Sequence, residues 1–236
     1  MRVKLVTFDV TNTIIKVLGS PGQQYASIGN LYGVTADPKD LNRAFIERWR
    51  EQNKIHPNYG VTSGKSSYTW WTDIVKQTFS QAGFKGQEEN LEAISGHLYK
   101  HFTSANAWDV LPYSHSVLQQ LKDRGIMLGV ISNFDSRLEK ILMNLELLHY
   151  FQFILTSEKV KVAKPDKKIF IEALNLANIS ADDSFHIGDN VENDYFGALN
   201  AGMNSVLLAT DISKLPNTVD KKFCISNLSE LLNILK

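Results

Sequence analysis

Short apolar runs alternate with longer helical patterns along much of the chain. Runs rich in β-branched residues predict buried strands at 3–8, 126–132, 151–156, 185–188 and 205–209. Apolar residues at helical spacing lie between the later strands, over 114–124, 137–148, 166–178 and 194–201. Strands that alternate with helices indicate a parallel sheet with right-handed crossovers.

One long segment breaks this alternation. Between residues 17 and 110 the pattern contains no convincing strand, but it predicts helices at 22–32, 39–53, 68–82 and 88–101. About ninety residues are too many for a plain crossover loop, and turn-rich stretches border the segment at 19–22 and 105–112. We therefore predict an α/β fold: a Rossmann-like parallel sheet core, 1–16 and 111–236, with an inserted all-helical cap, 17–110.

Composition and charge narrow the function classes. Lys+Arg and Asp+Glu both total 25, and this balance gives no basic excess for nucleic acid or an anionic membrane. Cys224 is the only cysteine, so no intramolecular disulfide forms, which fits a reducing compartment. The N-terminal apolar run is too short for a signal peptide, and no stretch approaches a membrane span. We expect a cytoplasmic protein; its oligomeric state stays open.

Polar residues follow the predicted strands at the points where those strands end. Asp9 follows the first strand, Ser132 ends the second, and Asp189 follows the fourth, with Asp194 five residues later. Lys164 precedes a predicted helix. Because open α/β sheets bind ligands at the carboxyl ends of their strands, we expect these side chains to share one site.

These residue types together suit phosphoryl transfer. An Asp carboxylate can attack phosphorus and form an aspartyl phosphate. Because its charge and that of a phosphate repel each other, the reaction needs cations, and Mg²⁺ prefers carboxylate, carbonyl and water oxygens. Asp189 and Asp194 are candidates for the acidic metal shell, and Lys164 for a fixed positive charge. Ser132 and nearby backbone amides are candidates for binding the phosphoryl oxygens.

Each of these residues, taken alone, has an ordinary structural interpretation. A strand-terminal Asp often caps a helix or a turn, and Ser132-Asn133 is typical of a turn. Lys164-Pro165-Asp166 is typical of a helix N-terminus. The order of the four motifs along the chain, each at or near a strand end, favours a shared site over four unrelated turns.

The four motifs resemble those of the haloacid dehalogenase-like hydrolase superfamily. The resemblance covers both the core and the inserted helical cap. The superfamily's first motif, Asp-x-Asp-x-Thr, is matched by Asp9-Val10-Thr11-Asn12-Thr13 except at the second Asp. Ser132, Lys164 and Gly188-Asp189 match the other three. Further stretches, among them Trp70-Trp71, resemble one subgroup of the superfamily. This second resemblance does not indicate a particular physiological substrate.

The resemblance also implies roles for individual residues. It makes Asp9 the nucleophile, assisted by Lys164 and Ser132. It implies that the phosphoryl group is bound by Ser132, Asn133 and Lys164. It also implies an Mg²⁺ site formed by Asp9, the Thr11 backbone carbonyl, Asp189 and Asp194. In the cap, we expect the loop 56–62, with Asn58 and Tyr59, to select the substrate, because caps in such enzymes close over the site.

Thr11 is the one departure from the first motif. The usual second Asp protonates the leaving oxygen and then activates the water that clears the aspartyl phosphate. Threonine does not titrate near neutrality, but it keeps the backbone carbonyl. Transport ATPases of the superfamily look similar here and have a long-lived phosphoenzyme. We therefore expect metal and phosphate binding to persist and turnover to be slow.

Three functions remain open from the sequence. The first is a Mg²⁺-dependent phosphatase for a small phosphorylated metabolite. The second is a binding or regulatory protein on a catalytically impaired phosphatase scaffold, which Thr11 favours. The third, a dehalogenase, fits least: haloacid dehalogenases need no metal, lack the Gly-Asp pair and carry an Arg soon after the nucleophile. Here Gly188-Asp189 is present, and the first basic residue after Asp9 is Lys16.

Overall fold

The computed structural model describes residues 3–235, so residues 1, 2 and 236 of the predicted core lie outside it. The described chain forms two compact units. The sheet unit comprises 3–16, 110–134 and 145–235, and the helical unit comprises 17–109 and 135–144.

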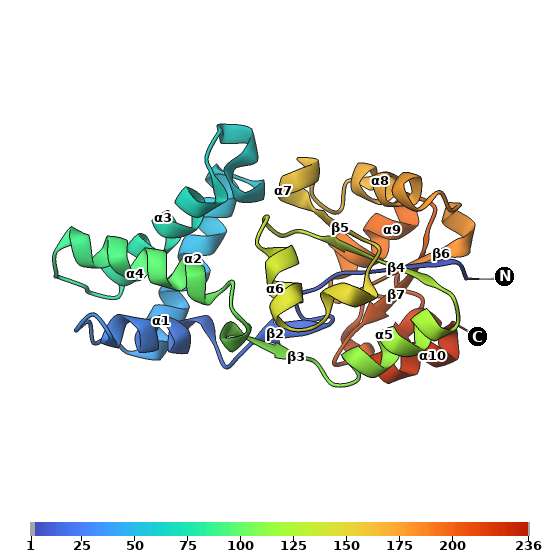
Figure 1. Ribbon diagram of the computed structural model, residues 1–236, viewed down its shortest axis with the longest axis horizontal. Coiled ribbons are helices and arrows are strands. Elements are labelled where there is room, and N and C mark those ends of the chain that lie inside the picture. Colours follow the sequence, from blue (N-terminus) through green and yellow to red (C-terminus); the bar gives the residue numbers. More distant parts are fainter. Residues whose placement is uncertain (1–2, 236) are drawn as a thin grey trace. The chain divides into compact units, whose positions relative to one another are not determined.

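A six-stranded parallel sheet forms the centre of the sheet unit (Figure 1). Its strand order is β5-β4-β1-β6-β7-β8, so β1 lies between β4 and β6. The bounds are β1 Leu5–Phe8, β4 Met127–Ser132, β5 Phe153–Thr156, β6 Ser184–Gly188, β7 Asn204–Leu208 and β8 Cys224–Ile225. The parallel sheet confirms the predicted fold class, whereas β8 was not predicted.

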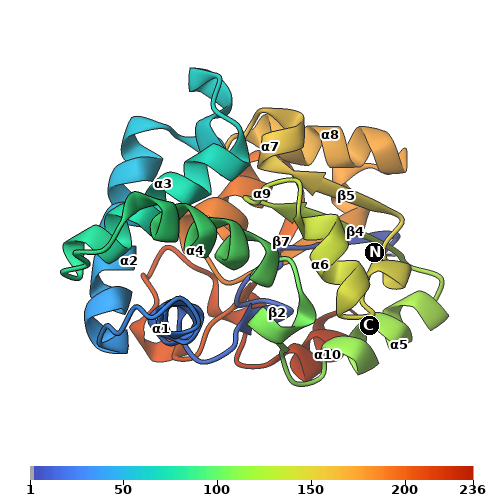
Figure 2. The same cartoon turned by 60° about the vertical axis from the view of Figure 1, so that its left-hand side comes forward.

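The central strands are apolar on both faces because helices cover the sheet on both sides. All residues of β1 and of β6 are buried, which explains their near-continuous apolar runs. The views place α8 (Lys167–Ala177) and α9 (Gly197–Asn200) on one face, and α5 (Ser114–Asp123) and α10 (Leu231–Ile234) on the other (Figures 1 and 2). Shorter elements complete the unit: η3 Leu148–Tyr150, α7 Ser157–Val160, η4 Ala181–Asp183, η5 Val191–Phe196, η6 Ile212–Lys214, η7 Lys221–Phe223 and η8 Leu228–Glu230.

The strand register brings the polar motifs level with each other. Phe8, the last residue of β1, pairs with Val130 of β4 and with Ile187 of β6. Asp9 extends the ladder by one bond, because its N–H donates to the Ile187 carbonyl at 2.8 Å. The carboxyl ends of the three central strands therefore meet at Asp9, as the sequence predicts for an open α/β sheet.

The predicted helix over 194–201 differs from the structure. The chain first forms a π-helical turn, η5, and only then the short helix α9. The Asn190 side chain caps this turn by accepting from the N–H groups of Glu192 and Asn193, at 3.0 and 2.8 Å. Because the cap lies at Asn190, the π turn begins before the start of the predicted helix. Asp194 is part of this turn.

The helical unit is built from α1 Pro21–Asn30, α2 Pro38–Ile55, η1 Asn58–Ser63, α3 Ser67–Gln81, α4 Glu88–His101, η2 Ala105–Ala107 and α6 Leu138–Asn144. The starts of three helices follow local capping rules: Ser20, Asp37 and Ser66 each accept a backbone N–H with the side chain. The unit has its own apolar core, which includes Tyr25, Leu41, Phe79, Ile94 and Leu98. Figure 2 shows α1 to α4 as a group.

Two features differ from the expected division of the chain. The segment 17–110 is not free of strands: β2 (Ile15–Val17) and β3 (Trp108–Val110) pair as a two-stranded sheet, outside the central one. The two strands lie at the start and the end of the inserted segment. Because about ninety residues separate them, no local sequence pattern predicts their pairing. In addition, 135–144 groups with the helical unit rather than with the sheet unit. Otherwise the domain borders stay a prediction. Within residues 3–235, no helix is both long and apolar enough to cross a membrane.

Candidate active site

Asp9 is the centre of a buried polar cluster at the end of β1. The residue is 7% exposed, and its Oδ1 accepts from Ser132 Oγ at 3.0 Å and from Lys164 Nζ at 2.7 Å. Burial raises the pKa of Asp9 above its ordinary value, with Asp194 adding to the rise and Lys164 opposing it. The two hydrogen bonds to one oxygen orient the carboxylate.

Lys164 is the fixed cation of this cluster. Its Nζ donates to Asp9 Oδ1, to Asp194 Oδ1 at 2.6 Å and to the Ile131 carbonyl at 2.8 Å, so all three ammonium protons are used. Burial by itself disfavours the charged amine, but the two carboxylates outweigh it and raise the pKa of Lys164. The side chain is therefore charged and held rigidly between two acids.

Asn133 holds the backbone of Lys164 with its side-chain amide. Its Nδ2 donates to the Lys164 carbonyl at 2.9 Å, and its Oδ1 accepts from the Lys164 N–H at 2.8 Å. This pair of bonds joins the turn after β4 to the segment that carries the lysine. The phosphate contact expected of Asn133 stays a prediction.

Asp194 lies against the end of β6 because Gly188 has no side chain. A Cβ at Gly188 would lie 2.2 Å from Asp194 Cγ, far closer than real contacts allow. The Oδ2 of Asp194 accepts from the Asn190 N–H at 3.0 Å. Burial would raise the pKa of Asp194, but Lys164 and His186 outweigh it and hold the pKa well below its ordinary value.

His186, which the sequence analysis did not single out, supports Asp194 from inside β6. Its ring is fully buried, with Nε2 at 3.2 Å from Asp194 Oδ1 and Nδ1 at 2.9 Å from Thr7 Oγ1. Burial lowers its pKa, so we assign the neutral tautomer in which Nε2–H donates to Asp194. The available signal was a histidine within an otherwise apolar strand, two residues before Gly188.

Asp189 is the third carboxyl group of this cluster, beside Asp9 and Asp194. Burial, followed by the charges of Asp9 and Asp194, raises its pKa to about 7, and a hydrogen bond from the Asn12 side chain opposes the rise. Asn12, a second residue that the sequence analysis did not assign, adopts a left-handed φ of 61°. A carboxyl group in this electrostatic position favours a cation beside it.

The donor set at this site fits Mg²⁺. One ligand atom from each of Asp9, Asp189 and Asp194 lies within 4.8 Å of the other two. These are hard carboxylate oxygens without histidine or cysteine among them, which is the donor type that Mg²⁺ prefers. Thr11 lies half-buried in the turn after Asp9, where its backbone forms a bridge with Ile15.

Asn58 and Tyr59 belong to the helical unit, in the short helix η1, where both have a left-handed φ. The Tyr59 ring packs against Trp70 and Trp71, with centroid distances of 5.2 and 6.1 Å. Tyr59 therefore contributes to an aromatic cluster in this unit. The substrate-selecting role of both residues stays a prediction.

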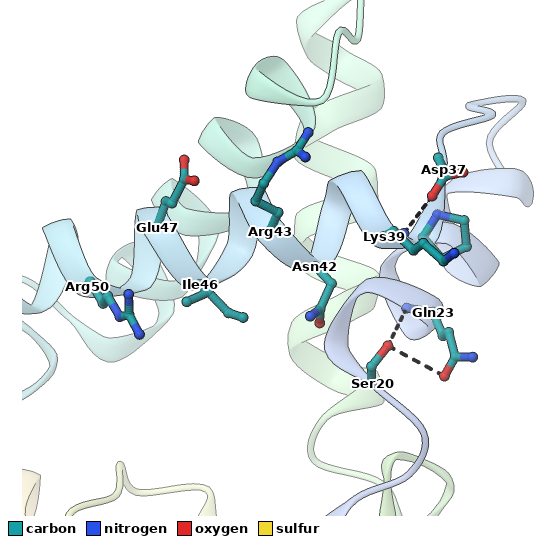
Figure 3. A pocket seen from close by; sticks show the side chains of 10 residues that line it. Ser20, Gln23, Asp37, Lys39, Asn42, Arg43, Ile46, Glu47 and Arg50 are labelled. Atoms are coloured by element: carbon teal, nitrogen blue, oxygen red, sulfur yellow. Dashed lines mark hydrogen bonds between the residues drawn. The ribbon is translucent and has the colours of Figure 1, made fainter.

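Each unit also has a surface cavity. In the sheet unit, a cavity of about 820 Å³ borders Asn12, Thr13 and Asp189, so it adjoins the acidic cluster. In the helical unit, a hollow of about 790 Å³ lies along α1 and α2 (Figure 3). Two of the hydrogen bonds drawn there, from the N–H groups of Gln23 and Lys39 to the side chains of Ser20 and Asp37, cap the two helices, so this hollow gives no indication of chemistry.

Comparisons with known proteins agree with these motifs. A family model described as a haloacid dehalogenase-like hydrolase matches residues 3–202. "Haloacid dehalogenase-like hydrolase domain-containing protein 3" of Bos taurus is 37% identical, over 100% of this chain and 94% of its own length. Proteins of the same name from Homo sapiens and Mus musculus match equally well.

Solved structures share the fold over the whole chain. The putative hydrolase YfnB of Bacillus subtilis, solved with magnesium, has a TM-score of 0.73 at 18% identity, covering 100% of this chain and 99% of its own. A phosphatase from Thermococcus onnurineus has a TM-score of 0.63 at 23% identity, with 99% and 98% covered. A 2-haloacid dehalogenase from Pseudomonas syringae has a TM-score of 0.66 at 22% identity, covering 99% of this chain and 98% of its own. At these identities the likeness shows the fold alone.

Proposed function

The chain belongs to the haloacid dehalogenase-like hydrolase family, as its motifs predicted, and on that premise we propose that it is a Mg²⁺-dependent phosphohydrolase. Its proposed substrate is a small phosphorylated molecule, and its proposed location is the cytoplasm. The observation that carries the proposal is the pair of bonds from Lys164 Nζ to Asp9 and Asp194, beside the separate carboxylate of Asp189. One lysine leaves this acidic trio with excess negative charge.

Asp9 is the proposed nucleophile. Because Oδ1 is held by Ser132 and Lys164, we assign the attack on phosphorus to Oδ2. The new Oδ2–P bond forms as the P–O bond to the leaving group breaks, and it gives an aspartyl phosphate. Water then attacks phosphorus, the P–Oδ2 bond breaks, and inorganic phosphate leaves with Asp9 restored.

The surrounding residues act by position and charge. Lys164 balances charge on Asp9 and on the phosphoryl oxygens, and Ser132 donates from its hydroxyl at the same place. Asp9, Asp189 and Asp194, with the Thr11 carbonyl, would hold Mg²⁺. When bound, the ion would supply the positive charge that neutralises the carboxylates and the phosphoryl group.

Thr11 sets the proposed limit on rate. No carboxyl group follows Asp9 by two residues, so the leaving oxygen takes its proton from solvent. General acid–base catalysis contributes roughly 10²–10⁴-fold in such reactions. Aryl phosphates, whose leaving groups need little protonation, should therefore react faster than alkyl phosphates.

A second function, a binding or regulatory protein on an impaired scaffold, rests on the same Thr11. It predicts that phosphate and Mg²⁺ bind without turnover. A dehalogenase is disfavoured, because the acidic trio Asp9, Asp189 and Asp194 suits a metal ion, which haloacid dehalogenases do not need.

A phosphatase screen over phosphorylated metabolites with Mg²⁺ tests the proposal, with Asp9→Asn as the blank. We expect Mg²⁺-dependent phosphate release that is lost in Asp9→Asn. Bound phosphate without any release would favour the binding protein. Halide release from a 2-haloacid without Mg²⁺ would contradict the proposed function.

A further inference from the structure

The turn after β4 continues into a segment that the helical unit holds. Ser132 ends β4, Asn133 and Phe134 follow, and from Asp135 to Asn144 the chain belongs to the helical unit. Only two residues, Asn133 and Phe134, therefore separate the proposed phosphoryl-binding Ser132 from the start of that segment. Whatever holds Asp135 acts directly on the end of this turn.

The Asp135 carboxylate is completely buried and bonded at both oxygens. Its Oδ1 accepts from the N–H and the Nε–H of Arg137, each at 2.9 Å. Its Oδ2 accepts from Arg137 at 2.6 Å and from the indole Nε1–H of Trp71 at 2.7 Å. A buried carboxylate with this many donors has little freedom to move.

Arg137 is fixed in turn by aromatic rings of the helical unit. Its guanidinium carbon lies 4.1 Å from the ring centroid of Tyr99 and 5.2 Å from that of Trp71. Both distances are within the range of cation–π attraction. The far end of the segment is held as well, because the Asn144 side chain donates to the Thr103 carbonyl at 2.9 Å.

The start of the turn is tied to the chemistry. Ser132 donates to Asp9, and Asn133 clamps the backbone of Lys164. The Phe134 N–H donates to the Ser132 carbonyl at 2.9 Å, which makes the turn tight. A tight turn anchored at both ends transmits a displacement of one end to the other.

We propose that Trp71, Asp135 and Arg137 are positioning residues that set the geometry of the phosphoryl-binding turn Ser132–Asn133. The effect on phosphate binding rests on the proposed function. The effect on the geometry of the turn does not. It makes α3 of the helical unit, through the Trp71 indole, a determinant of phosphate affinity. Trp71 acts through its contacts with Asp135 and Arg137, and we assign it no part in the reaction itself.

Two neighbouring tryptophans of α3 provide a matched test. Trp71 donates its indole N–H to Asp135, whereas Trp70 donates its own to the His56 carbonyl, within the helical unit, at 2.7 Å. Trp71→Phe and Trp70→Phe each remove one N–H and keep an aromatic ring. Asp135 keeps its three bonds from Arg137 in Trp71→Phe, so this variant should fold.

The measurement is an NMR titration of each full-length variant with inorganic phosphate in Mg²⁺, followed at the backbone amides of residues 132–134. In Trp71→Phe we expect these amide signals to shift and the Kd for phosphate to rise roughly three- to ten-fold, the order set by one typical net hydrogen bond. In Trp70→Phe we expect a lower Tm but unchanged signals and Kd. Asp135→Asn should reproduce Trp71→Phe more strongly.

The proposal is overturned if the amides of 132–134 respond alike to both tryptophan variants, or to neither. It is equally overturned if Kd rises in parallel with the loss of Tm, since that is the behaviour of a merely structural residue. Absence of turnover in the wild type would contradict the proposed phosphohydrolase function but not this inference. The amide signals report the geometry of the turn whether or not a reaction takes place.

Discussion

At the scale of single residues, Asp189 is the group whose charge depends most on conditions. Its pKa is raised to about 7 by burial and by the two neighbouring carboxylates. Because the folded pKa lies above the ordinary carboxyl value of 3.8, the metal-free protein loses stability as pH rises from about 4 to about 7, and the loss is complete once Asp189 is ionised in the folded state. A cation beside Asp189 reverses that loss.

This sign gives a test of the metal site. Below pH 7 a proton occupies Asp189 and competes with Mg²⁺, so affinity should fall by about tenfold for each pH unit between 7 and 5. Titration calorimetry at pH 6 and pH 8 measures this, with Asp189→Asn as the variant that lacks the titrating group. Equal affinities at both values in the wild type would contradict the assignment.

Gly188 gives a second test at this scale. The Cβ of Gly188→Ala would meet the Asp194 carboxyl at 2.2 Å, so Asp194 must move. We expect a loss of about 1–3 kcal/mol in the free energy of unfolding, as for overpacking elsewhere, and weaker Mg²⁺ binding. Gly96→Ala, whose Cβ would make an ordinary contact at 3.5 Å with Tyr68, is the control and should leave both quantities unharmed.

Some residues of the site were predictable from the sequence, and others were not. Asp9, Ser132, Lys164 and Asp194 follow strands or precede helices in a recognisable order. In the structure, Ser132 and Lys164 donate to Asp9, and Lys164 also donates to Asp194. His186 was missed because its role depends on Asp194, eight residues away, and no pattern within β6 shows that contact. The raised pKa of Asp189 likewise arises from groups that only the fold brings together.

At the scale of elements, the length of an element decides whether its pattern is readable. β1 and β6 are long and buried enough to stand out as apolar runs, whereas β8 has two residues and offers no period. β2 and β3 pair across the whole helical segment, which no local window detects. The π turn η5 depends on an Asn190 cap, whose signal is also that of an ordinary turn.

The η5 turn carries a prediction of its own. Asn190→Ala removes the acceptor for the N–H groups of Glu192 and Asn193, which should cost about 0.5–2 kcal/mol, as for other N-caps. Because the same turn holds Asp194, Mg²⁺ affinity should fall as well. Ser66→Ala removes a comparable cap from α3 and should lower Tm without changing the affinity; an equal effect on Mg²⁺ in both variants would refute the role of η5.

At the scale of the whole molecule, the two connections that border residues 17–109 are the expected points of cleavage. Limited proteolysis should cut within 19–22 or 105–109, where the sequence is rich in turn residues, and leave the sheet unit resistant. Mass spectrometry of the fragments locates the cuts. First cuts inside β4 or β6 would contradict the division into a core and a cap.

The central claim is that Asp9 accepts a phosphoryl group and, because Thr11 supplies no carboxyl group, releases it slowly. The most direct measurement is acid-quench trapping of the phosphoenzyme during turnover of an aryl phosphate with Mg²⁺, in the wild type, Asp9→Asn and Thr11→Asp. We expect an acid-stable phosphoryl group on Asp9 in the wild type and none in Asp9→Asn. In Thr11→Asp we expect turnover faster by roughly ten-fold or more, within the range of general acid–base catalysis. Phosphate release without a trapped intermediate, or release that persists in Asp9→Asn, would contradict the account.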